Sequence, residues 1–159
     1  MIIGVDQSFT ATGVAVIDCK GAILHTEKLG KHMVGHEAIA HIVDMVDTIL
    51  QEYWEGTLHT HVACEQPPYS KGMSSSYQML CALYGVLVYA FGAEGVNPAS
   101  WKSYIAQNKL RGIKKATKAG AAEYCRIISE IAGYTFDDTD IADAWCIAEY
   151  MRRWKYEQL

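Results

Sequence analysis

The sequence lacks an apolar run long enough to span a bilayer, and its first residues, MIIGVDQS, contain neither a basic segment nor a signal-peptide cleavage site. Its five cysteines are scattered and form no CxxC pair, so we expect neither a zinc site nor a disulfide framework. A reducing compartment suits such a chain. These absences predict a cytoplasmic protein, in a nucleoid or in the cytoplasm of a host cell, with no membrane partner.

One stretch of the chain lacks acidic residues, although the protein as a whole has a formal net charge of −4. No Asp or Glu occurs from Gly95 to Ala122, and the basic residues there are Lys102, Lys109, Arg111, Lys114, Lys115 and Lys118. Basic side chains clustered in this way predict contact with a nucleic-acid backbone, from which they release counterions. A solvated helix face with its adjoining loop is the alternative interpretation.

The chain also lacks internal repeats, low-complexity segments and linkers, so its 159 residues predict one domain, 1–159. Apolar runs predict strands at about 1–6, 13–18, 22–29, 59–65 and 92–97. Helical periodicity predicts helices at about 36–54, 75–91, 98–110, 115–131 and 139–154. This order, βββαβαβααα, predicts an α/β layer fold with one five-stranded mixed sheet flanked by helices.

Two of the expected strands end on a carboxylate. Asp6 ends the first strand and Glu65 ends the fourth. If these strands are parallel neighbours, both side chains lie at the same edge of the sheet, where sites of α/β proteins form. An ordinary polar strand end is the alternative for each residue.

The stretch DDTDIADAWCIAEY, from Asp137 to Tyr150, has four aspartates before an apolar helical run. Capping of the last helix explains Asp137 and Asp138. Asp143 lies beyond the capping positions and shares one helix face with Asp140, three residues earlier. Two like charges on one face favour a cation between them, and Mg²⁺ prefers such oxygen ligands.

These segments together resemble a known family. The residues IIGVDQSFTATGVAVID, VACEQPPYSKG and DIADAWCIAEY resemble the RuvC family of Holliday junction resolvases, within the ribonuclease H-like nucleases, and the resemblance extends over nearly the whole chain. It implies a homodimer that nicks two strands of a four-way DNA junction symmetrically, with Mg²⁺ and no nucleotide cofactor. The acids of the family correspond to Asp6, Glu65, Asp140 and Asp143, and two of its basic residues correspond to Lys102 and Lys118.

The implied chemistry is metal-assisted hydrolysis. Four carboxylates suit two Mg²⁺ ions about 4 Å apart, with Mn²⁺ as a substitute. Asp6, central in the sheet, is expected to bridge both ions, and Lys118 is expected to neutralise charge on the phosphate.

Further contacts are expected outside the acids. Tyr69 and Lys71 follow Glu65 in the loop PPYSKGMSSS, and the ring of Tyr69 is expected to stack on unpaired bases at the junction. An ordinary surface tyrosine is its alternative. The apolar helix 75–91 is expected to supply a dimer interface, with core packing alone as its alternative.

Three rival functions remain open at this point. An RNA-processing nuclease of the YqgF type has the same fold. A junction-binding protein without catalysis is disfavoured by the intact acids. Actin-like ATPases and sugar kinases share the first strand and hairpin, but they need two such domains.

Overall fold

The structure confirms the order of elements expected from the sequence, βββαβαβααα. This computed structural model describes residues 1–8, 11–29, 35–53, 60–68, 74–107 and 109–157. The elements are β1 (Ile2–Asp6), β2 (Thr12–Ile17), β3 (Ile23–Leu29), α1 (Gly35–Tyr53), β4 (His61–Glu65), α2 (Ser75–Phe91), β5 (Glu94–Val96), α3 (Pro98–Ala106), α4 (Lys118–Ala132) and α5 (Thr139–Tyr156).

The fourth helix begins later than expected, at Lys118 rather than at residue 115. Thr117 caps it, because its Oγ1 accepts a hydrogen bond of 3.0 Å from the N–H of Gly120. The N–H of Thr117 in turn donates to the carbonyl of Lys114 at 3.0 Å. This turn leaves Lys114 and Lys115 outside the helix, in the loop between α3 and α4.

The five strands form one sheet in the order β3-β2-β1-β4-β5. β1 pairs antiparallel with β2, and β2 with β3, as the short links between them predict. β1 pairs in parallel with β4, and β4 with β5, because the intervening helices α1 and α2 return the chain to the same end of the sheet. The expected five-stranded mixed sheet is therefore confirmed.

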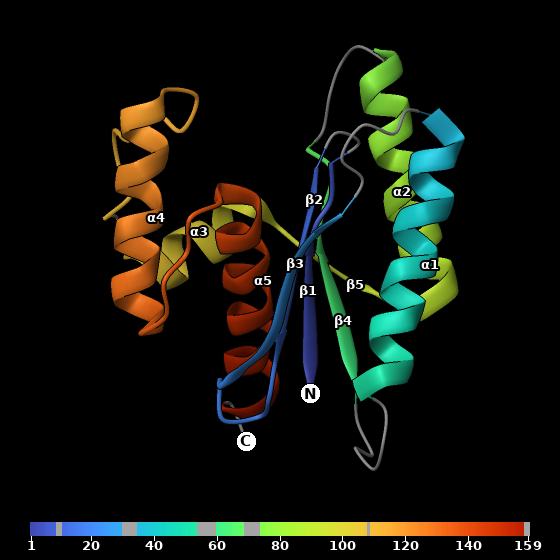
Figure 1. Ribbon diagram of the computed structural model, residues 1–159, viewed down its shortest axis with the longest axis horizontal. Coiled ribbons are helices and arrows are strands. Elements are labelled where there is room, and N and C mark those ends of the chain that lie inside the picture. The colour runs from blue at the N-terminus through green and yellow to red at the C-terminus, as the bar shows by residue number, and fades with distance from the viewer. Residues whose placement is uncertain (9–10, 30–34, 54–59, 69–73, 108, 158–159) are drawn as a thin grey trace.

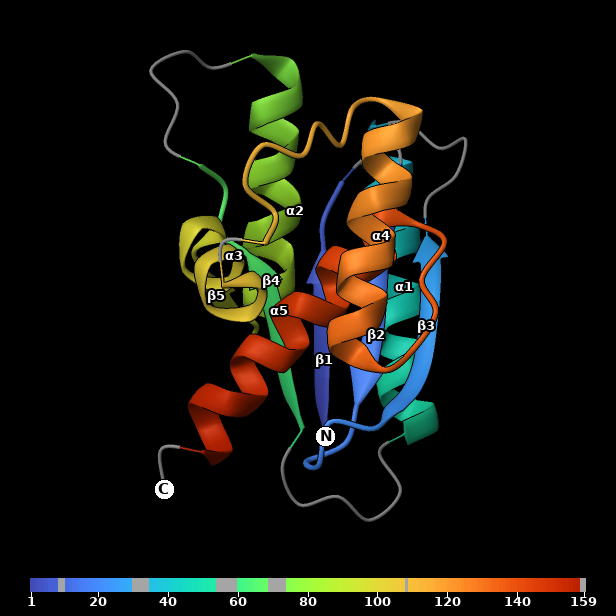
Figure 2. The ribbon, with the colours of Figure 1, turned by 90° about the vertical axis from the view of Figure 1, so that its left-hand side faces the viewer.

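Helices cover both faces of the sheet (Figure 1). α1 and α2 lie on one face, where Ile42, Val46, Leu83 and Leu87 pack against apolar residues of the strands. α3 and α5 lie on the other face, and α4 packs against the outer side of α5 (Figures 1 and 2). Within the described ranges, no helix is long and apolar enough to cross a membrane.

The middle of the last helix, α5, is buried. Every residue from Ala142 to Glu149 is buried, including the charged Glu149. Two arginines compensate this charge: the Nε atoms of Arg152 and Arg153 each lie 2.6 Å from a carboxylate oxygen of Glu149. Burial alone would raise the pKa of Glu149, but the hydrogen bonds from the two arginines outweigh it and lower the pKa. The ion pairs therefore stabilise the folded state at neutral pH.

We expect Glu149→Gln to lower the free energy of unfolding at pH 7 by about 2–3 kcal/mol, because three hydrogen bonds from Arg152 and Arg153 lose their charged, buried acceptor. Since the folded pKa is lowered, this stability is fully present above the ordinary pKa of 4.5 and is lost as the pH falls through the folded value. Denaturant unfolding from pH 7 to pH 3 measures both effects. The matched control is Glu130→Gln, which removes an exposed ion pair with Arg126 and should change stability little. Equal losses in the two variants would contradict the role of burial.

Candidate active site

Asp6 and Glu65 lie side by side at one edge of the sheet. In the parallel pairing of β1 with β4, Val5 is opposite Cys64, so the residues that follow them are level with each other. Side chains alternate between the two faces of a sheet. Ile2 and Ala63 belong to the core on the side of α5, and Asp6 and Glu65 share their parity. Both carboxylates therefore face the layer that contains α5. The parallel pairing puts them at the same edge of the sheet, as expected from the sequence.

The beginning of α5 brings two further acids to this edge. Asp138 is the N-cap of the helix, and its Oδ1 accepts hydrogen bonds from the N–H groups of Asp140 (2.8 Å) and Ile141 (3.3 Å). Capping by Asp138 is thus confirmed, whereas Asp137 precedes the cap and is exposed. Asp140 lies in the first turn, and Asp143, 5 % exposed, lies in the second.

Two glycines allow α5 to approach the sheet so closely. A Cβ at Gly4 in β1 would lie 2.7 Å from the backbone nitrogen of Ala148. A Cβ at Gly13 in β2 would overlap the backbone of Asp140 and lie 2.8 Å from the nitrogen of Ile141. Gly13 is also the residue paired with Asp6. The first turn of α5 therefore rests directly on the position beside Asp6.

The four acids interact through their charges. The pKa of Asp6 is raised well above its ordinary value, first by burial and then by the charges of Asp143 and Glu65. Asp140 raises it further, and Lys115 opposes these effects. The other three predicted acids are therefore all near enough to Asp6 to act on it through their charges.

Glu65 has two partners on α3. The indole Nε1 of Trp101, a fully buried side chain, donates to Oε2 of Glu65 at 3.1 Å. The ammonium of Lys102 lies 3.8 Å from the same oxygen and 4.8 Å from the centre of the Trp101 ring. Lys102, predicted from the family resemblance, is therefore beside the acids.

Asp140 is bound by a lysine from the edge strand β3. Nζ of Lys28, in β3, lies 2.8 Å from Oδ2 of Asp140 and 2.5 Å from Oδ2 of Asp138. Partial burial would lower the pKa of Lys28, but its hydrogen bonds to Asp138 and Asp140 outweigh burial and raise it. Lys28 thus ties the beginning of α5 to β3.

Asp143 is bound from α4 and the loop before it. The hydroxyl of Tyr124 donates to Oδ1 of Asp143, and Nζ of Lys115 donates to Oδ2. Burial, followed by the charge of Asp143, raises the pKa of Tyr124, so its hydroxyl remains a donor. Lys115, one of the basic residues predicted to bind DNA, is therefore in contact with the acid Asp143. Lys118 is exposed at the start of α4 and forms no ion pair with the described residues.

The donor set suits a divalent metal ion by its chemistry. Four carboxylates that repel one another, Asp6 and the three acids near it, provide the oxygen ligands and the negative charge that Mg²⁺ requires. In the structure these acids bind other side chains instead: Glu65 binds Trp101 and Asp140 binds Lys28. Asp143 binds Tyr124 and Lys115. Within the described ranges, accordingly, no three His, Cys, Asp or Glu side chains converge closely enough to form a metal site.

The remaining basic residues of the predicted stretch before α4 lie in the loop between α3 and α4. Lys109, Arg111 and Lys114 are exposed in the α3–α4 loop, and Arg111 lines a cavity of about 350 Å³ together with Lys102 and Lys115. Two members of the predicted basic stretch, Lys102 and Lys115, therefore contact the acids directly. Tyr69 and Lys71 lie outside the described residues.

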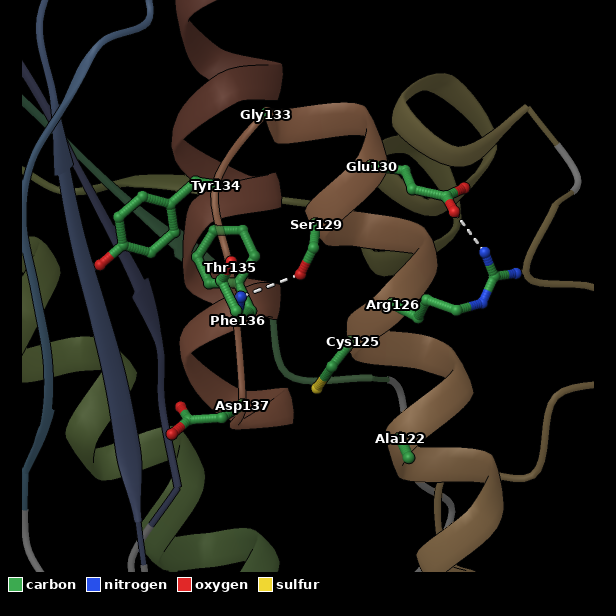
Figure 3. Close-up of a pocket in the computed structure, with 10 residues that line it drawn as sticks. All are labelled: Ala122, Cys125, Arg126, Ser129, Glu130, Gly133, Tyr134, Thr135, Phe136 and Asp137. Carbon is green, nitrogen blue, oxygen red and sulfur yellow. Dashed lines mark hydrogen bonds and ion pairs between the residues drawn. The ribbon is translucent and has the colours of Figure 1, made fainter.

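A larger hollow lies elsewhere, between α4 and the segment that precedes α5. Its volume is about 1,020 Å³, and Figure 3 shows the residues that line it. Its polar groups pair among themselves: Arg126 binds Glu130, and the hydroxyl of Ser129 accepts a hydrogen bond from the N–H of Phe136 at 2.9 Å. None of the four acids lines this hollow, so we do not assign the chemistry to it.

Sequence reasoning missed three residues that touch the acids: Lys28, Trp101 and Tyr124. The aromatic pair carried a signal, because a buried Trp or Tyr needs a partner for its polar group. Lys28 carried none, since its partners lie 110 and 112 residues away along the chain.

The sheet order and its crossovers define a ribonuclease H-like fold. Two solved structures share it over nearly the whole chain. T. thermophilus RuvC in complex with a Holliday junction substrate is 16% identical, with a TM-score of 0.68, over 97% of this chain and 94% of that chain. A second structure of Thermus thermophilus RuvC is 19% identical, with a TM-score of 0.63, over 98% and 96%. The protein therefore has the RuvC fold. No protein-family model and no curated protein matches the sequence.

We expect Gly13→Ala to lower the free energy of unfolding by about 2–3 kcal/mol, because the new methyl group displaces α5 from β2. Gly85→Ala is the control: no atom lies within 4 Å of a Cβ there, and alanine in the interior of α2 should stabilise by about 0.5–1 kcal/mol. Denaturant unfolding measures both variants. A Gly13→Ala protein as stable as the wild type would refute the close approach of α5.

Proposed function

We propose that this protein is a nuclease that resolves Holliday junctions and related branched DNA by symmetric nicking. One observation carries the proposal: acids from β1, β4 and α5 gather around Asp6 at one edge of a RuvC fold, beside a run of basic residues. The likeness to T. thermophilus RuvC bound to a Holliday junction substrate supports this choice of DNA.

The proposed reaction is hydrolysis of a backbone phosphodiester. The hydroxyl of a water adds to phosphorus, the bond to the 3′ oxygen breaks, and the proton passes to that oxygen. Asp6, Glu65, Asp140 and Asp143 would hold two divalent ions, Mg²⁺ or Mn²⁺, which when bound supply Lewis acidity and an activated water. Lys102 and Lys115 place positive charge beside these acids, and Lys118 remains a predicted third cation at the phosphate.

The DNA is proposed to lie along the basic stretch. Lys102, Lys109, Arg111, Lys114, Lys115 and Lys118 would neutralise backbone phosphates near the acids. Tyr69 and Lys71 remain predicted contacts at the branch point. Two cuts on a symmetric junction require two sites in register, so we propose a homodimer through the exposed side of α2. Tyr89, 93 % exposed on this helix, is available for such an interface.

The deciding experiment is cleavage of an immobile four-way junction, with linear duplex DNA and structured RNA as parallel substrates. We expect paired nicks in the junction with Mg²⁺ or Mn²⁺, and none in the duplex. Asp6→Asn, Glu65→Gln, Asp140→Asn and Asp143→Asn should each abolish cleavage while junction binding persists, because the loss of an acid lessens repulsion of phosphate. Asp44→Asn, on the exposed side of α1 across the sheet, is the matched control and should cleave normally.

Each alternative gives a different result in this experiment. Cleavage of RNA alone would identify the YqgF-type function. Junction binding without cleavage in either metal would identify a non-catalytic junction protein. Cleavage by Asp143→Asn at the wild-type rate would remove Asp143 from the set of ligands. A complex with the mass of one protomer per junction would reject the dimer.

The basic stretch is tested by the salt dependence of binding. For Lys114→Ala and Lys118→Ala we expect weaker junction binding and a slope of log affinity against log salt that is flatter by about 0.9 for each lost phosphate contact. Fluorescence anisotropy at several salt concentrations measures the slope. Lys20→Ala, in the exposed β2–β3 turn at the other end of the sheet, should leave the slope unchanged. An unaltered slope in the double variant would mean that the two lysines are merely solvated.

A further inference from the structure

The carboxylate of Asp143 has both of its oxygens occupied, and the two partners differ in kind. Tyr124 donates a hydroxyl to Oδ1, and Lys115 donates an ammonium to Oδ2. The tyrosine is neutral and buried, with 2 % of its surface exposed. The Lys115 side chain is 34% exposed, so it has a path to solvent.

Tyr124 is held firmly. It lies on α4 within the core that α4 forms with α5, and the ammonium of Lys115 covers its ring at 4.4 Å from the ring centre. Rotation of the hydroxyl away from Asp143 would leave a polar group buried without a partner, which is costly. The hydrogen bond from Tyr124 to Asp143 is therefore costly to break.

Lys115 is held by a different kind of contact. Lys115 lies in the loop before α4, two residues ahead of the N-cap Thr117. It makes one ion pair with Asp143 and one contact with the ring of Tyr124. A metal ion that binds Oδ2 must therefore displace the ammonium of Lys115. Oδ1 is the more hindered oxygen, because the buried hydroxyl of Tyr124 takes one of its two acceptor positions.

We propose that Tyr124 is a positioning residue that holds Oδ1 of Asp143 and so directs a divalent ion to Oδ2, where the ion competes with Lys115. This inference rests on the proposed function, since it concerns how a ligand of that site is held. Tyr124 would aim the carboxylate, and Lys115 would balance its charge until the ion arrives and then be released toward the phosphate.

The two side chains must then have opposite effects on metal affinity. Loss of the Tyr124 hydroxyl lets the carboxylate rotate and weakens its alignment, and such outer contacts commonly change metal affinity by about 10- to 100-fold. Loss of the Lys115 charge removes the competitor and a repulsive charge, which should tighten binding by roughly fivefold or more. Simple damage to the fold would weaken binding in both cases.

The experiment measures Mn²⁺ binding to the free protein, without DNA, from the loss of the free-ion signal in electron paramagnetic resonance. Tyr124→Phe is expected to bind Mn²⁺ about 10- to 100-fold more weakly than the wild type. Lys115→Met is expected to bind it roughly fivefold or more tightly. Tyr134→Phe, which removes a hydroxyl that contacts Thr26, and Lys20→Met, which removes an exposed charge at the other end of the sheet, are the controls and should change affinity little.

Unchanged affinity in Tyr124→Phe, or weaker binding in Lys115→Met, would overturn the inference. If Tyr124→Phe does not fold in a thermal unfolding measurement, the sign of the Lys115→Met effect decides. Wild-type protein that binds Mn²⁺ with the expected variant effects but cuts no junction would refute the proposed function and leave the positioning role intact. Cleavage by the wild type together with unshifted Mn²⁺ binding in both variants would refute only the positioning role.

Discussion

The contact of α5 with the bare backbone of β1 and β2 governs the rest of the structure. At Gly4 and Gly13 the strands present no side chain, so Ala148 and the backbone of Asp140 rest on the sheet itself. A helix packed on ordinary side chains would stand several Å further away. Because Gly13 is paired with Asp6, this approach sets the distance between the acids of α5 and the acid of β1. α4 then packs on α5 and brings Tyr124 to Asp143.

The same contact creates an electrostatic problem. It gathers four carboxylates at one edge, and the pKa of Asp6 is raised by its burial and by its acidic neighbours. The fold answers with donors from four segments: Lys28 of β3, Trp101 of α3, Tyr124 of α4 and Lys115 of the loop before α4. These donors bind Asp140, Glu65 and Asp143, so the repulsion is relieved around Asp6 rather than at it.

Much of this arrangement was predictable from local patterns. Strands ending on Asp6 and Glu65 predict two acids at one edge, and the spacing of Asp140 and Asp143 predicts one helix face. The late start of α4 was not predicted, because it depends on a turn closed by Thr117. That turn is also why Lys115, outside the helix, reaches the acids, whereas Lys118 inside it does not. Contacts such as Lys28 with Asp140 depend on tertiary packing and leave no local pattern.

A low identity to the RuvC structures is compatible with so similar a fold, because few positions fix the geometry. The chain needs glycine where α5 touches the sheet, acids at two strand ends and one helix start, and apolar residues of suitable size elsewhere. The donors around the acids are Lys28, Trp101, Tyr124 and Lys115, and each of them reaches a particular carboxylate oxygen. Partners of this kind orient a carboxylate and tune how tightly it holds an ion.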